Sequence, residues 1–110
     1  MSTNSATKAI VDYLNMRKCK VWRSNNVGIY DAKKNIYRKN PNQLLGTSDI
    51  IGITKDGFFI GIEIKTGKDK LSPEQNIFIE EITKRKGIIL VVKSFDDFLL
   101  QWDNINKKPL

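Results

Sequence analysis

The segment SDIIGITKDGFFIGIEIKTG, residues 48–67, constrains the fold of this chain more than any other. β-Branched and aromatic residues dominate it, and residues 55–57 interrupt them with Lys-Asp-Gly, which predicts two β-strands joined by a tight turn. Strands this apolar belong in the interior of a sheet. The first strand nevertheless opens with Asp49, and the second carries Glu63 and Lys65 two residues apart, so these two share one face.

The length of the turn decides whether the two acids meet. A two-residue loop would send Asp49 and Glu63 to opposite faces of the sheet. A three-residue loop with Gly57 in the left-handed conformation pairs the two acids across the strands, with Cβ atoms roughly 5 Å apart. We favour the three-residue loop because it also brings Lys65 to the same side. In that register Gly61 lies opposite an apolar side chain and leaves room for another element to approach closely.

Hydrophobic periodicity and capping residues predict the remaining elements. They are a helix over residues 6–17, a strand over 20–23, a second strand near 27–30 followed by a polar loop to 46, a helix over 73–86, a strand over 88–93 covered on both faces, and a last helix from 95. Ser72 and Gln75 form a capping-box pattern at the start of the second helix, and Gly87 follows it as a stop. The order predicts a single domain, residues 1–110, that forms an α/β sandwich with a mixed central sheet flanked by helices.

Charge and composition narrow the classes of function. The chain has 19 Lys and Arg against 12 Asp and Glu, a formal net charge of +7. That excess favours a polyanion such as nucleic acid as partner, although lysines that only keep a protein in solution remain an alternative. One cysteine and no histidine exclude a Cys/His zinc site and a Ser-His or Cys-His nucleophile. We expect no membrane segment, no secretory signal and no small-molecule cofactor, and therefore the cytosol, that of the host cell if the protein is viral.

Paired carboxylates beside a lysine indicate phosphodiester hydrolysis. Two adjacent carboxylates repel each other, and a divalent cation such as Mg²⁺ relieves that repulsion while it binds substrate phosphate. Asp49, Glu63 and the backbone carbonyl of Ile64 are the candidate metal ligands. Lys65 would orient an attacking water or stabilise the charge that develops on phosphorus. The alternative is structural: Asp49 would only start a strand, and Glu63 and Lys65 would form an ordinary surface pair.

An ordered set of residues from about Val21 to Phe98 resembles the VRR-NUC (virus-type replication-repair nuclease) module of the PD-(D/E)xK nuclease superfamily. The set comprises Gly46, Asp49, Glu63, Lys65, Gly67, Leu71, Ser72, Gln75 and Gly87. The resemblance implies a restriction-endonuclease-like fold, Mg²⁺ or Mn²⁺ at Asp49 and Glu63, and Lys65 as the catalytic lysine. It also implies that Gln75 turns toward the site, a role that competes with the capping box. Family members often carry a metal-binding glutamate on the first helix, where this chain offers only Asp12, and the number of metals stays open.

The resemblance further implies a viral or prophage endonuclease of replication or repair, a homodimer that acts on branched DNA such as Holliday junctions. Phe98, Leu99 and Trp102 are candidate interface residues, with core packing as the alternative. Tyr30 and Tyr37 could stack on splayed bases or pack in the fold. The candidate nucleic-acid contacts are Arg23, Lys33, Lys34, Arg38, Lys39, Ser48, Lys68 and Lys70. Two rival functions remain: a DNA-binding module without catalysis, and a nuclease subunit whose specificity comes from a partner protein.

Overall fold

A computed structural model describes residues 3–24, 29–38 and 46–106 of the chain. Its elements are α1 (Thr3–Met16), β1 (Lys20–Arg23), β2 (Ile29–Asp31), β3 (Ile36–Arg38), β4 (Ile50–Ile53), β5 (Phe59–Ile64), α2 (Pro73–Lys84), β6 (Ile88–Val92) and α3 (Phe95–Ile105). In these three ranges, no helix has both the length and the apolar character that a bilayer span requires. The predicted order is confirmed, with β3 added.

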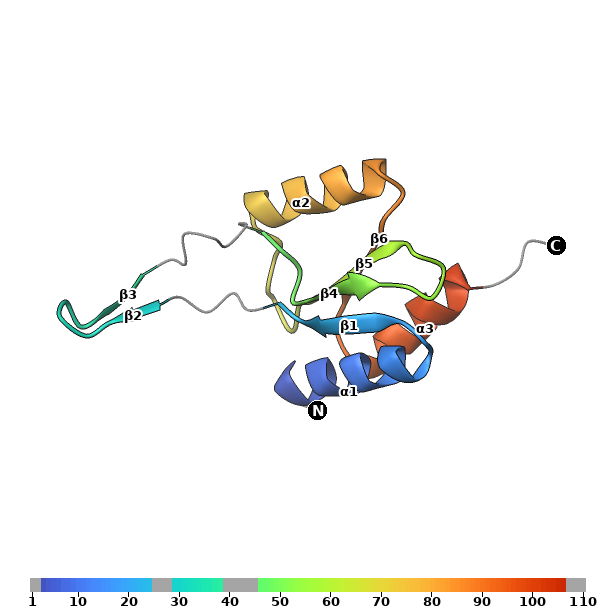
Figure 1. Cartoon of the computed structure of the whole chain (residues 1–110), viewed down its shortest axis with the longest axis horizontal. Coiled ribbons are helices and arrows are strands. Elements are labelled where there is room, and N and C mark those ends of the chain that lie inside the picture. The colour runs from blue at the N-terminus through green and yellow to red at the C-terminus, as the bar shows by residue number, and fades with distance from the viewer. Residues whose placement is uncertain (1–2, 25–28, 39–45, 107–110) are drawn as a thin grey trace.

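Four strands form the central sheet in the order β1-β4-β5-β6. The pairs β1–β4 and β4–β5 are antiparallel, whereas β5–β6 is parallel, so the sheet is mixed. Helices α1 and α3 cover one face and α2 covers part of the other (Figure 1). The predicted α/β sandwich, consistent with a restriction-endonuclease-like fold, is therefore confirmed.

The segment between β1 and β4 contains a second, two-stranded sheet where the sequence predicted one strand and a loop. β2 pairs with β3 antiparallel, from Ile29 opposite Arg38 to Asp31 opposite Ile36. The predicted strand is confirmed at residues 29 and 30, and residues 27 and 28 lie outside the described part. Figure 1 shows this hairpin projecting away from the central sheet. The loop prediction was wrong at residues 36–38, because these residues form a strand, β3, that pairs with β2.

The β4–β5 hairpin adopts the favoured register. Ile51 lies opposite Gly61 and Ile53 opposite Phe59. Gly57 has φ +91°, and its N–H donates to the Thr54 carbonyl at 2.9 Å, which closes the three-residue loop. A turn with one left-handed residue thus sets the alternation of every side chain on both strands.

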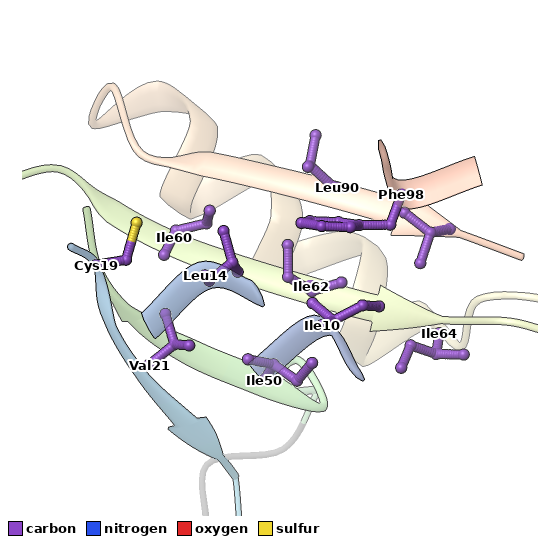
Figure 2. Packing of buried hydrophobic residues seen from close by; sticks show 11 residues of the cluster. Ile10, Leu14, Cys19, Val21, Ile50, Ile60, Ile62, Ile64, Leu90 and Phe98 are labelled. Atoms are coloured by element: carbon purple, nitrogen blue, oxygen red, sulfur yellow. The ribbon is translucent and has the colours of Figure 1, made fainter. Parts of the chain in front are cut away.

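The hydrophobic core fills the space between the sheet and the helices α1 and α3 (Figure 2). Alternate residues of β5 enter it, and Phe98 of α3 is fully buried there. Because Phe98 is in the core, core packing rather than an interface role holds for this residue. Leu99 and Trp102 are partly buried against the same cluster. The core consists of Ile10, Leu14, Cys19, Val21, Ile50, Ile60, Ile62, Ile64, Leu90, Val92 and Phe98.

Helix α2 begins as the sequence predicts and ends at Lys84, two residues before the predicted end at residue 86. Ser72 is the N-cap in a complete capping box with Gln75, and Pro73 is the first helical residue. At the other end, Lys86 takes the left-handed conformation with φ +70°. The N–H groups of Lys86 and Gly87 donate to the carbonyls of residues 83 and 82, the bonding pattern of a Schellman motif.

Side-chain amides from the helices form hydrogen bonds with the backbone of both outer strands of the central sheet. Asn15 of α1 bonds both backbone groups of Val21 in β1, donating to its carbonyl at 3.1 Å and accepting from its N–H at 2.9 Å. Gln101 of α3 donates to the carbonyl of Val91 in β6 at 2.9 Å. Val91 itself is 36 % exposed, so the prediction that this strand is covered on both faces was wrong. β6 is an outer strand of the central sheet.

Candidate active site

The two predicted carboxylates meet at one end of the sheet. Asp49 immediately precedes β4, and Glu63 is the fifth residue of β5. The carboxylate of Asp49 accepts a hydrogen bond from the backbone N–H of Ile64 at 2.8 Å, which fixes it against β5. The N–H and carbonyl of one strand residue point to the same side. The Ile64 carbonyl is thereby directed toward Asp49.

Glu63 is buried with an unsatisfied oxygen. It is 2 % exposed, and its Oε2 has no hydrogen-bond donor among the described residues. Burial, as the largest cause, and the neighbouring Asp49 together raise the pKa of Glu63 from 4.5 to about 8. The positive charge of the Lys65 ammonium lowers the pKa of Glu63 and so partly offsets this rise. A buried carboxyl of this kind either keeps its proton or gains a cation.

Gln75 performs both of the roles that appeared to compete. Its Oε1 accepts from the N–H of Ser72 at 2.8 Å and completes the capping box. Its Nε2 donates to Oε1 of Glu63 at 2.9 Å. One conformation fills both roles because the two ends of the amide face different partners. The start of α2 and the orientation of Glu63 are therefore held by a single side chain.

Ser48 lies over the sheet next to the acids. It is fully buried, and its Oγ has no hydrogen-bond partner among the described residues. A Cβ placed on Gly61 would come within 2.9 Å of this oxygen and 2.8 Å of Cδ1 of Ile89. Because Gly61 has no side chain, the residue before Asp49 can lie close to β5. The sequence predicted such a close approach at Gly61, although not which residue would make it. In this position the Ser48 hydroxyl does not face solvent.

The donor set fits a hard divalent cation. Asp49 and Glu63 bring two carboxylates together, one with a free buried oxygen, and the half-buried Lys65 follows on the same face. Oxygen ligands of this kind suit Mg²⁺ or Mn²⁺. Over the described residues, no group of three acidic, histidine or cysteine side chains forms. The protein would accordingly supply two carboxylates and leave the other positions to water, backbone and phosphate.

The first helix contributes amide and hydroxyl groups rather than an acid at its start. Arg23 at the end of β1 donates to Oδ1 of Asn4 at 3.3 Å. A cavity of about 460 Å³ opens there, with Asn4, Ser5, Lys8, Val11 and Arg23 along its walls. Asp12 pairs with Lys8 on the exposed side of α1 at 2.6 Å. Asp12 therefore does not replace the missing helix-one glutamate near the carboxylate pair.

The predicted phosphate contacts spread over several elements. Arg23 is exposed, and its side chain points to the α1 face of the sheet, where it bonds Asn4. Its backbone is close to the site, since the N–H of the next residue, Ser24, donates to the Asp49 carbonyl at 2.8 Å. Lys68 and Lys70 are exposed in the connection from β5 to α2. Lys33 and Lys34 are exposed in the turn of the projecting β2–β3 hairpin. Arg38 ends β3, and Lys39 lies outside the described residues.

A mixed α/β sandwich with an acid before one strand and Glu-x-Lys on the next defines the class of PD-(D/E)xK nuclease modules. The family model described as the VRR-NUC domain matches residues 5–96, most of the chain. The protein belongs to the VRR-NUC family and is a nuclease-type module for processing DNA. No curated protein and no solved structure matches the chain at a significant level.

Proposed function

We propose that this protein is a metal-dependent endonuclease that hydrolyses phosphodiester bonds of branched DNA. The observation that carries the proposal is the buried Glu63 beside Asp49, with one carboxylate oxygen left without a donor. A structural carboxylate would be bonded on both oxygens, because an unsatisfied buried acceptor costs about 1–3 kcal/mol. A divalent cation would compensate that cost.

Each residue of the site then has a role in the reaction. Asp49 and Glu63 bind the cation, together with the Ile64 carbonyl, and Gln75 fixes the rotamer of Glu63. When bound, Mg²⁺ or Mn²⁺ supplies positive charge to the scissile phosphate. Lys65 lies close enough to lower the pKa of Glu63, so its ammonium can hold the attacking water or stabilise the pentacovalent phosphorus.

The net charge of +7 suits a DNA substrate. We propose that the enzyme is a viral or prophage protein of the host cytosol, with all of residues 1–110 in one domain. We propose a homodimer, because paired nicks on a four-way junction need two active sites related by a twofold axis. On α3, Leu100 and Ile105 are 67 % and 46 % exposed and can enter such an interface.

A second function is favoured by one observation. The described residues contribute two carboxylates to the candidate metal site. At the start of α1, where family members often have a glutamate, this chain has Asn4. A module of this kind could bind DNA without cutting it. It could also require a partner protein for its activity.

Cleavage assays distinguish these functions. Labelled junction, flap and linear duplex DNA are incubated with the protein in Mg²⁺, in Mn²⁺ and in EDTA. Nicks that need metal and disappear in Lys65→Ala, while binding to DNA persists, support the endonuclease. Binding in both metals without any nick would favour the non-catalytic module. Nicks that appear only after host extract or a partner is added would indicate a nuclease subunit.

A further inference from the structure

The face of the sheet that carries the carboxylates is only half covered. α2 covers β5 through the contact of Phe78 with Phe59, at 6.2 Å between ring centroids, and through the bond from Gln75 to Glu63. On β1 and β4 the same face carries three apolar residues that we call the open strip. They are Trp22, Ile51 and Ile53. Trp22 and Ile53 are each 49 % exposed.

Strand pairing places Trp22 next to the acids. Val21 is buried in the core, so the alternation of β1 sends Trp22 to the opposite, carboxylate-bearing face. Trp22 lies opposite Ile51, and Asp49 is two residues before Ile51 on β4. Diagonal neighbours of this kind are roughly 7–8 Å apart. An indole that is half exposed to solvent therefore adjoins the carboxylate pair.

The charges around the open strip favour nucleic acid as its occupant. Lys20 is exposed two residues before Trp22 on the same face of β1, and the half-buried Lys65 lies on that face beyond the acids, so Trp22 lies between two ammonium groups. Arg23 points to the opposite face, where it bonds Asn4 of α1. The strip contains no carboxylate of its own, and the acids at its end are those that would bind the cation. Basic groups that follow a phosphate backbone, with an aromatic ring between them, form the usual platform for unpaired bases.

We propose that Trp22 stacks on an unpaired nucleobase next to the phosphodiester at Asp49 and Glu63. The substrate class is then DNA with a single-stranded or splayed segment, and intact duplex is disfavoured because its bases are already stacked. This inference rests on the proposed nuclease function and specifies the substrate of the same site.

A fluorescence titration tests the platform. In a Trp102→Phe background Trp22 is the sole tryptophan, because the chain has two. The protein is titrated in EDTA with an oligothymidine, with an abasic oligonucleotide of the same length, and with duplex DNA. We expect the oligothymidine to quench Trp22 and to bind about tenfold more tightly than the abasic strand.

Variants separate stacking from other roles of the strip. Trp22→Ala should weaken binding of oligothymidine about tenfold and leave the abasic strand unaffected. Trp22→Leu keeps an apolar side chain for folding and should show the same loss. Phe58→Ala is the matched control, since Phe58 is an aromatic residue of nearly the same exposure, 48 %, that lies outside the open strip, and both affinities should stay within about twofold of wild type.

Three results would overturn the platform. Equal affinity for oligothymidine and the abasic strand is one, and unchanged affinity in both Trp22 variants is another. A third is a dimer, measured by sedimentation, that becomes monomeric in Trp22→Leu without any loss of DNA affinity, since the strip would then join two copies. Failure of the nuclease function looks different: oligothymidine still quenches Trp22, but no DNA is cut in either metal.

Discussion

Replacing Glu63 with glutamine should stabilise the metal-free protein at neutral and alkaline pH. The pKa of Glu63 is about 8 in the fold and 4.5 as its ordinary value. Because the folded value is the higher one, the stabilisation by this group is complete below pH 4.5 and is lost as the pH rises through 8. At about 1.4 kcal/mol per unit of pKa, the full loss is on the order of 5 kcal/mol. Glutamine retains the bond from Gln75, avoids the charge and can donate to Asp49.

Urea unfolding in EDTA at several pH values from 4.5 to 9 measures the effect. In the difference between the free energies of unfolding of wild type and Glu63→Gln, the pH-dependent contributions of all other groups cancel. We expect this difference to be small at pH 4.5 and to grow in favour of the variant up to pH 9. Mn²⁺ should stabilise the wild type and not the variant. A difference that stays constant across the range would refute the argument that the fold buries an unpaired carboxyl.

Three further substitutions follow from the same site. Lys65→Ala should lower the nicking rate by about 10²–10³-fold with little change in DNA affinity, as measured by nicking assays and fluorescence anisotropy; a rate within threefold of wild type would remove Lys65 from the mechanism. Gln75→Glu keeps the cap but adds a third carboxylate beside Glu63, so metal-free stability should fall and Mn²⁺ should restore it; a melting temperature equal to wild type in EDTA speaks against the contact. Gly61→Ala forces a Cβ against the Ser48 hydroxyl, and thermal melts should show a loss of about 1–3 kcal/mol; an unchanged melt would mean that Ser48 is not held there.

The hairpin and its register could be predicted from the sequence because they depend on local geometry. Gly57 supplies the left-handed residue of a three-residue turn, and the two-residue period of strands carries that choice to Asp49 and Glu63. The capping box at Ser72 is equally local. Features of this kind need only short-range bonds and alternation, which the order of residues already contains.

Features that depend on contacts between distant residues could not be predicted. The second bond of Gln75 requires the distance between α2 and β5, which no pattern in either segment gives; only the resemblance to the family implied that Gln75 turns toward the site. β3 is only three residues long and lies within a stretch rich in Asn and Lys, and its strand forms through pairing with β2. The exposure of Trp22 did have a signal, since an inward Val21 sends its neighbour outward. Sequence alone left open whether another element covers that face.

The amides of Asn15 and Gln101 restrict how two copies of this protein can assemble. Each occupies backbone groups that a strand from another molecule would need, so the sheet resists extension across subunits at either border. A homodimer would then have to join through a helix surface or a sheet face and not through an intermolecular extension of the central sheet. The same protection should keep a concentrated solution of the protein from ordering into fibrils, and replacing both amides with alanine would remove it.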